Sequence, residues 1–430
     1  MSKIRLHGSS SGYTEIAPVA ASGNNTLTLP NDGTIISKDS NGAVGVTSMK
    51  SSNVNVGAAV TITESGIEAS GIGITCANIN GSAIGGRRNI IINGAMQVAQ
   101  RSTSETGIGA AAGYFTLDRF RTTFSNTAGR VTMAQVADVH DGFANALKFT
   151  CTTADTSIGS SEYFILQQKI EGQDLQQLRK GSSDAKEFTV SFYVKGNASA
   201  TYILEIFDLD NSRQISKTFS VTTSWTRVVL TFPADTTGAF GDDNAASLQL
   251  GIWLHAGSDY TSGTLNSSAF AANTNANRAV GTTSFFDSTD RTFFLTGLQL
   301  EVGSQATAFE HRSFGEELAL CQRYYYVHLE SGNSGKSFMN SNQYNSSASY
   351  GHLQFACTMR TSPTLEIASG TNYYGAFGNS TAQYVSDLST VQTNPNGAEL
   401  GGSTSSFSSG QSIWWRAHNA SSKIAFTAEL

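Results

Sequence analysis

Cysteine and long apolar runs are scarce in this chain of 430 residues. The four cysteines, Cys76, Cys151, Cys321 and Cys357, lie far apart and form no CxxC or CxH pairing. This spacing argues against a zinc site or a disulfide framework and favours scattered thiols in a reducing cytoplasm. No apolar run approaches the roughly 20 residues that span a bilayer, so we expect no membrane insertion. The opening residues, MSKIRLHGSSSGYTEIAP, lack the apolar core of a signal peptide.

Charge is also scarce, because charged residues make up only 14% of the chain and the net charge is -6 at pH 7. No basic patch is available to neutralise phosphates, so we expect no nucleic-acid partner. The 42 glycines and the many Ser, Thr, Asn and Ala residues suit short strands joined by small polar loops. Helical bundles need more Lys and Glu on their solvated faces. The chain is long enough for two or three domains.

The segment 186–232 is the centre of the predicted fold. In TVSFYVKG, Val190, Phe192 and Val194 fall on one face, and Val228, Leu230 and Phe232 alternate in the same way after the turn at Asn211-Ser212. A period of two residues is typical of strands that are half buried against a core. We therefore predict an antiparallel β-sandwich here.

Further elements can be placed around this centre. We predict strands near 130–137, 146–152, 162–170, 248–255 and 291–310, and a short helix over 172–179. The polar stretch 257–289 is long for a loop in a compact domain and is of the kind that carries function. The segment 313–329 predicts an amphipathic helix, with Glu316 and Glu317 in its first turn, that introduces a C-terminal β-rich domain over 313–430.

The first 88 residues have a different texture from the rest. Residues 1–40 predict two short strand pairs with too few apolar side chains to fold alone. Residues 41–88 alternate small aliphatic and polar side chains, with frequent glycine and no aromatic residue. Three intertwined copies could gather these aliphatics on one axis, which predicts a homotrimeric shaft. The alternative is a flexible linker, although linkers rarely carry so regular an alternation. Large apolar residues begin at Asn89.

Several motifs together carry a family resemblance. The run TVSFYVKG, TSWTRVVLTF, LQLGIWL and FFLTGLQLEVGS followed by ATAFEHR resembles carbohydrate-binding-module-like jelly rolls, which assigns a jelly roll to 89–312. The run from NIIINGAMQVAQR through FEHRSFGEELALCQRYY to the final AEL looks like bacteriophage tail-fibre proteins. The segment IRLHGSSSGYTEIAPVAASGNNTLTLP is similar to the one with which such fibres begin, so the match covers most of the chain. The resemblance implies a homotrimeric virion protein, made in the host cytoplasm, that attaches through residues 1–40 to the tail or an adaptor protein. It also implies adhesion to the host, with a surface glycan as receptor.

The candidate binding residues are aromatic and polar. On the strand LQLGIWLH, alternation places Gln249, Trp253 and His255 on the face opposite the leucines, a set that suits stacking on a sugar ring and bonding its hydroxyls. The alternative is burial of Trp253 under a loop or a neighbouring subunit.

In the C-terminal region, Tyr373, Tyr374 and Tyr384 stand among Asn, Ser and Gly, as on a recognition surface. In a trimer such rings could instead form core between subunits. Trp414 and Trp415 lie in a strand and are weaker candidates.

Nothing in the sequence predicts catalysis, a metal site or a cofactor. The local carboxylate pairs Asp208/Asp210, Asp242/Asp243 and Asp287/Asp290 lie in turns, where Asp is favoured for its own hydrogen bonds. A turn of this kind has ligands for Ca²⁺ but no identifying spacing. We therefore expect a binding protein and not an enzyme. The alternative hypotheses are an architectural virion component, such as a head fibre, and a glycan depolymerase. A depolymerase would need two carboxylates about 5–10 Å apart.

Overall fold

The computed structural model describes residues 87–430. Before residue 87 it describes only the backbone of three antiparallel strand pairs: β1 (Ile4–His7) with β2 (Tyr13–Ile16), β3 (Val60–Thr63) with β4 (Gly66–Ala69), and β5 (Asn78–Ile79) with β6 (Ser82–Ala83). The chain divides into two units, Met1–Cys76 and Ala77–Leu430. Apart from these strands and residues 87–88, the predicted attachment segment (1–40) and shaft (41–88) lie outside the described residues.

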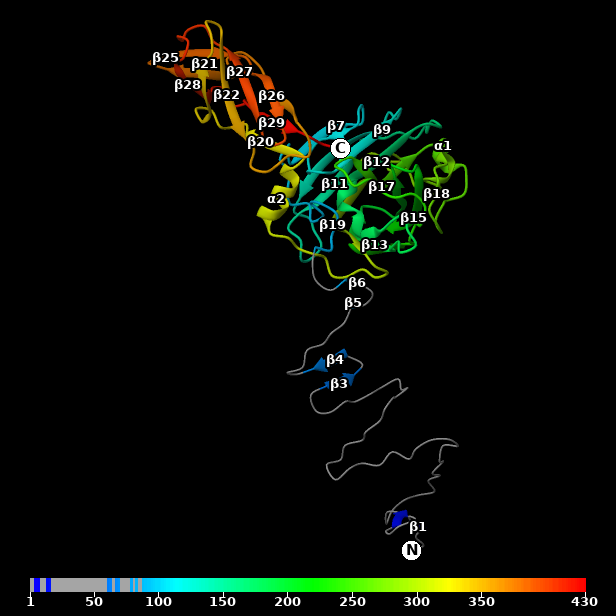
Figure 1. Ribbon diagram of the computed structural model, residues 1–430. Coiled ribbons are helices and arrows are strands. Elements are labelled where there is room, and N and C mark those ends of the chain that lie inside the picture. The colour runs from blue at the N-terminus through cyan, green and yellow to red at the C-terminus, as the bar shows by residue number, and fades with distance from the viewer. Residues whose placement is uncertain are drawn as a thin grey trace. The chain divides into compact units, whose positions relative to one another are not determined.

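Two antiparallel sheets form a sandwich in the first part of the second unit (Figure 1). The six-stranded sheet has the order β16 (Thr226–Phe232), β13 (Phe188–Gly196), β19 (Thr292–Val302), β11 (Ala146–Thr153), β10 (Arg130–Val136) and β7 (Ser104–Ile108). The seven-stranded sheet has the order β18 (Ala271–Ala272), β15 (Arg213–Val221), β14 (Ala200–Asp208), β17 (Ala246–Ala256), β12 (Tyr163–Glu171), β9 (Arg121–Ser125) and β8 (Gly113–Tyr114). The predicted all-β class and antiparallel jelly-roll sandwich are confirmed.

The core of the sandwich lies between these two sheets. Val190, Phe192 and Val194 of β13 are fully buried in it, as their alternation predicts. The leucines of β17 enter the same core from the opposite sheet. Gln249, Gly251 and Trp253, which alternate with them, therefore lie on the outer face of the seven-stranded sheet.

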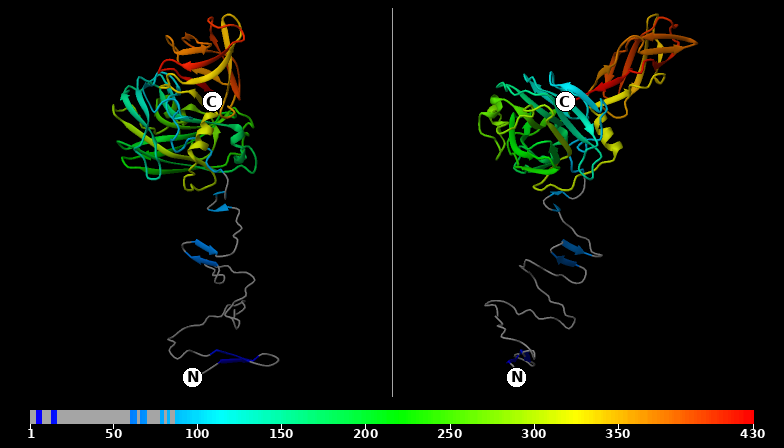
Figure 2. Two further views of the ribbon diagram at one scale, coloured as in Figure 1. Left: turned by 90° about the vertical axis from the view of Figure 1, so that its left-hand side faces the viewer. Right: turned by 180° about the vertical axis from the view of Figure 1, so that it is seen from behind.

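A second β body follows and has a core of its own (Figure 2). Its three-stranded sheet has the order β20 (Tyr325–Leu329), β29 (Ile424–Thr427) and β23 (Thr364–Ile367). Its seven-stranded sheet has the order β25 (Thr381–Val385), β24 (Tyr374–Gly378), β28 (Ser412–Ala417), β21 (Ser337–Gln343), β22 (Ala348–Gln354), β27 (Gly397–Ser403) and β26 (Ser389–Asn394). The last strand of the chain is thus central in the smaller sheet.

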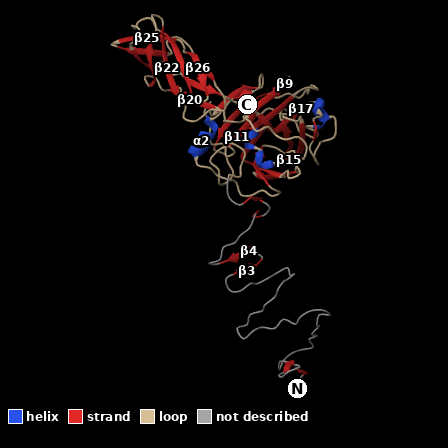
Figure 3. Cartoon of the chain, viewed as in Figure 1, coloured by secondary structure: helices blue, strands red, loops and turns tan. Residues whose placement is uncertain are grey.

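Helices are few and short in the described residues (Figure 3). The helix α2 (Phe314–Gln322) begins at Ser313, whose side chain accepts a hydrogen bond from the Glu316 N–H. The predicted helix over 313–329 is too long, because residues 325–329 form β20. The predicted helix over 172–179 is two 3-10 helices, η1 (Gly172–Asp174) and η2 (Gln176–Leu178). The stretch 257–289 contains only α1 (Ser258–Thr261), β18 and the 3-10 helix η3 (Asn275–Asn277).

Buried charges join the second β body to the sandwich. Arg119 is fully buried, and its guanidinium donates to the Glu429 carboxylate and lies 3.4 Å from the centre of the Tyr324 ring. Glu171, at the end of β12, accepts two hydrogen bonds from Arg323 at 2.8 and 2.6 Å and a further one from the Tyr324 hydroxyl. These contacts connect residues that are more than 100 positions apart.

Candidate functional site

The strand β17 places Gln249 and Trp253, but not His255, on the outer face of the seven-stranded sheet. A register shift pairs Trp253 with Ile165 and His255 with Phe164, so Leu254 is an extra residue in β17. Cross-strand partners share a face, and Phe164 is in the core. The predicted grouping of all three residues on one face is therefore wrong for His255, because the bulge turns it to the other side.

His255 is fully buried and is held by polar neighbours. Its Nδ1 lies 2.8 Å from Ser284 Oγ, and its Nε2 lies 3.2 Å from Glu162 Oε2. Burial lowers the pKa of the imidazole, although the neighbouring Glu162 acts in the opposite direction. These contacts give His255 a structural position inside the sandwich.

Trp253 is on the outer face but is not exposed, since its exposed fraction is 0%. Its Nε1 donates to Glu205 Oε2 at 3.0 Å, and the centroid of its ring lies 5.2 Å from that of the Tyr260 ring in α1. Arg278, which follows η3, lies 4.9 Å from the centre of the indole. The polar stretch 257–289 therefore covers Trp253, which is the alternative that the sequence left open.

A buried ion pair fixes this covering loop to the sheet. Arg278 donates through Nε and Nη2 to the two oxygens of Glu205, at 2.6 and 2.8 Å. Glu205 has no exposed surface. Although burial disfavours the charged guanidinium, the hydrogen bonds from Arg278 to Glu205 raise the pKa of Arg278 overall. The pair is a bidentate contact of the kind that gives a fixed geometry.

A cleft of about 270 Å³ opens on the outer face between the sheet and this loop. We call it the sheet cleft, and it is lined by Thr123, Tyr163, Ile165, Gln167, Phe207, Leu209, Gln249, Trp253, Tyr260, Asn275 and Arg278. Rings line it from β12, β14 and α1, and no Asp or Glu is among these lining residues. A cleft lined by rings with a few polar groups is the usual form of a small-molecule site.

Two side-chain amides at the sheet cleft have donors or acceptors without a hydrogen-bond partner among the described residues. Gln249 is only 7% exposed, yet its side chain makes no hydrogen bond to any described residue. Gln167 accepts from Thr123 Oγ1 at 2.9 Å, and its Nε2 has no partner among the described residues. Neither amide is among the fully buried side-chain groups that lack a partner, so the unbonded atoms of both reach the solvent in the cleft. These amides are therefore the groups most ready to receive a ligand.

The three tyrosines predicted as binding residues do not form one site. Tyr374 is fully buried, and its hydroxyl donates to the carbonyls of Ala368 and Lys423 at 2.7 and 2.9 Å. Tyr373 is half buried and adjoins the Tyr374 ring. Tyr384 is exposed on the other side of the sheet. Only Tyr384 presents much of its ring to solvent.

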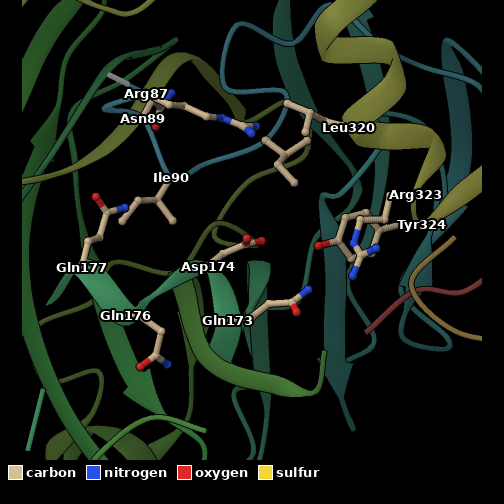
Figure 4. A pocket seen from close by; sticks show the side chains of 11 residues that line it. Arg87, Asn89, Ile90, Gln173, Asp174, Gln176, Gln177, Leu320, Arg323 and Tyr324 are labelled. Carbon is tan, nitrogen blue, oxygen red and sulfur yellow. The ribbon is translucent and has the colours of Figure 1, made fainter. Parts of the chain in front are cut away.

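A larger pocket of about 480 Å³ lies between residues 87–92, the two 3-10 helices and α2 (Figure 4). The Asp174 carboxylate points toward the middle of this pocket (Figure 4). Its other polar groups mostly serve the fold: Gln173 and Arg323 donate to Glu171, and Gln176 donates to the carbonyls of Gly172 and Gly241. Gln173, Gln176 and Arg323 are therefore already engaged within the fold, whereas the side chains of Arg87, Asp174 and Gln177 make no hydrogen bond to a described residue.

The described part of the chain contains no group of three or more His, Cys, Asp or Glu residues placed to hold a metal ion. None of its helices is both long and apolar enough to cross a bilayer.

Among the comparisons with known proteins, the one with solved structures gives matches. No family model matches the chain, and no curated protein matches it. Similar solved structures include a CBM4 module (14% identity, 49% of this chain and 97% of that one, TM-score 0.25) and TmCBM61 in complex with β-1,4-galactotriose (12%, 50% and 99%, TM-score 0.27). Another is the enzymatically active domain of tailspike protein 4 of bacteriophage CBA120 (12%, 50% and 21%, TM-score 0.27). Likenesses this remote do not identify a ligand for this chain.

Several residues of the sheet cleft carry only weak signals in the sequence and were not predicted. Tyr163 and Gln167 alternate on β12 with core residues, so the period-two pattern could have placed them on the outer face. Tyr260 and Arg278 belong to the polar stretch 257–289, whose path across the sheet has no local signal. The length of that stretch was the one indication that it carries function.

Proposed function

We propose that this chain is a non-catalytic glycan-binding protein and that the sheet cleft holds a sugar ring. The observation that carries the proposal is the unbonded, nearly buried amide of Gln249 beside the rings of Tyr163, Phe207 and Tyr260. Aromatic rings pack against the apolar face of a sugar, and an amide can both donate to and accept from its hydroxyl groups. The cleft volume is near the lower limit of about 300 Å³ for small-molecule sites.

Binding without catalysis is the form of the proposal that these lining residues support. A glycosidase needs two carboxylates about 5–10 Å apart. The nearest carboxylate described above is that of Glu205, and Arg278 and Trp253 already engage it. It therefore serves to position the loop and is not available as an acid or a base.

The wider proposal is a homotrimeric bacteriophage tail fibre that adheres to a host surface glycan. Its support is the sequence: residues 41–88 are too poor in large side chains to enclose a core from one copy. In this proposal residues 1–40 attach the fibre to the tail or an adaptor protein. Three weak sites acting together would give firm adhesion.

The test uses the full chain on an array of bacterial surface polysaccharides and soluble oligosaccharides. We expect the wild type to retain at least one glycan and Gln249→Ala to weaken that binding about tenfold, the loss of two hydrogen bonds at roughly 0.7 kcal/mol each. The melting temperature should change by less than about 2 °C.

Gln177→Ala is the matched control, because it removes an amide from the larger pocket instead. This variant should bind as the wild type does. The proposal fails if no glycan is retained, or if Gln177→Ala loses binding while Gln249→Ala keeps it. An architectural role predicts the first of these outcomes, and release of reducing sugar would indicate a depolymerase.

A further inference from the structure

The strand β28 places two consecutive tryptophans on opposite faces of the C-terminal seven-stranded sheet. Trp415 is fully buried in the core of the second β body and donates through Nε1 to Ser341 Oγ at 3.0 Å. Trp414 points the other way and is 37% exposed. The core accounts for Trp415, but it gives no reason for a large ring at position 414.

Trp414 is one of several rings on this outer face. Its cross-strand partner Phe377 is stacked on it, with centroids 6.3 Å apart and planes 19° apart. Tyr384, on the edge strand β25, lies edge-on to Phe377 with centroids 6.0 Å apart and is 41% exposed. The three rings form a row across three adjacent strands.

A glycine makes room for this row of rings. A Cβ atom on Gly375 would lie 2.7 Å from the Phe377 ring and 3.1 Å from the Tyr384 ring. Both rings thus occupy the space above the backbone of Gly375 and lean over the sheet. The Phe377 and Trp414 rings are nearly parallel, whereas the Tyr384 ring stands edge-on to Phe377 at the border of the row.

Arg416 adds a positive charge to the row. Its guanidinium carbon lies 5.0 Å from the centre of the Phe377 ring and 5.8 Å from that of Trp414. The only hydrogen bond that its side chain makes to a described residue runs from Nε to Ser337 Oγ, at 3.3 Å. It forms no ion pair within the described chain, so its two Nη groups remain available. Guanidinium groups bind carboxylates through two parallel hydrogen bonds.

Amides flank the rings on the same face. Asn340 is the cross-strand partner of Trp414, and Asn342 lies two residues further along β21; both are exposed. We name the set of Asn340, Asn342, Phe377, Tyr384, Trp414 and Arg416 the aromatic face. Stacking rings, a guanidinium without an acidic partner and neighbouring amides match a sugar ring that bears a carboxylate.

We propose that the aromatic face is a second binding site, separate from the sheet cleft, for an acidic saccharide such as a hexuronic acid. The ring of the sugar stacks on Trp414, and its carboxylate bonds to Arg416. Charge argues for this occupant, because a hexuronic acid supplies the anion that the Arg416 guanidinium lacks within the described chain, and a subunit contact would bury that charge unless it placed a carboxylate opposite it. The proposal does not rest on binding at the sheet cleft.

The test measures binding of the full chain to two soluble probes by calorimetry. One probe is a hexuronic acid oligosaccharide, and the other is the same oligosaccharide with its carboxyl groups reduced to alcohols. We expect the acidic probe to bind about tenfold more tightly than the reduced one, as a charge-assisted contact gives. Arg416→Gln should remove that difference, and Trp414→Ala should weaken both probes.

Two control variants make the result specific. Lys186→Gln removes an exposed positive charge from the sandwich and should keep the preference for the acidic probe. Gln249→Ala should also keep it, so that failure of the sheet cleft and failure of the aromatic face are distinguishable. Equal binding of the two probes by the wild type, or wild-type behaviour of Trp414→Ala and Arg416→Gln, would overturn the proposal. A fall in oligomeric mass with Trp414→Ala would overturn it too, by identifying a subunit contact.

Discussion

At the residue scale, the sheet cleft depends on the ion pair between Glu205 and Arg278. We predict that Arg278→Ala destabilises the sandwich by about 3–5 kcal/mol, because it leaves a buried carboxylate without its cation. Thermal and urea unfolding of the full chain would measure the loss. Adding Glu205→Gln should restore part of the stability, since the uncompensated charge is then removed.

The matched control is an ion pair at the surface. Arg179 Nη1 lies 3.8 Å from Asp184 Oδ2, and both side chains are well exposed. Asp184→Asn should therefore change the free energy of unfolding by less than about 1 kcal/mol. If Asp184→Asn and Arg278→Ala lowered the free energy of unfolding equally, the buried Glu205–Arg278 pair would stabilise the fold no more than a surface pair does.

Residue alternation predicts part of the candidate site and fails at identifiable points. It places Gln249 and Trp253 on the outer face correctly. It fails for His255, because the bulge at Leu254 inserts one residue and nothing in LQLGIWLH marks it. It also cannot show that Trp253 is covered, since Arg278 and Tyr260 arrive from a loop that is distant in sequence.

At the scale of elements, the end of β12 and the end of α2 meet at Glu171. Burial disfavours its charged form, but hydrogen bonds from Arg323, Tyr324 and Gln173 hold the pKa of Glu171 below its ordinary value. A depressed carboxylate pKa contributes stability above the unfolded-state pKa, about 4.3, and this contribution is lost as pH falls through the folded-state pKa. Acid should therefore loosen the attachment of the second β body to the sandwich.

Glu171→Gln isolates this contribution from those of other carboxylates. We predict that the variant is less stable than the wild type at pH 7 and that the difference narrows as the pH falls below the unfolded-state pKa of about 4.3. Thermal unfolding at several pH values would measure it. Parallel pH profiles for the two proteins would mean that Glu171 is not the group that titrates.

At the boundary between α2 and β20, the sequence predicts the start of the helix but not its end. The prediction places the start of the helix correctly, with Glu316 and Glu317 in its first turn. It does not indicate that the helix ends at Gln322, because Tyr325–Leu329 becomes a strand only by pairing with β29 near the end of the chain. Pairing over such a distance has no local pattern.

At the scale of the whole molecule, composition is a sound guide to the class of fold. Many β-branched and small polar residues with little charge predict strands and loops, and both β bodies have that form. Composition says less about ligands: the cleft and the aromatic face each combine residues from several strands. These residues become neighbours only through the order of the strands in each sheet, and no single segment of the sequence shows that order.

The last prediction concerns the number of chains that act together. Residues 41–88 offer only small aliphatic side chains, and a single copy cannot bury enough of them to offset the entropy of ordering. We therefore expect the full chain to have three times its 45.5 kDa mass in solution, as measured by light scattering. A chain that begins at Ala77, the start of the second unit, should lose this state. It should also adhere to host cells roughly 10²–10⁴-fold less well, because each remaining site then binds alone. A monomeric full chain, or a shortened chain that stays trimeric, would remove the shaft as the trimerising element.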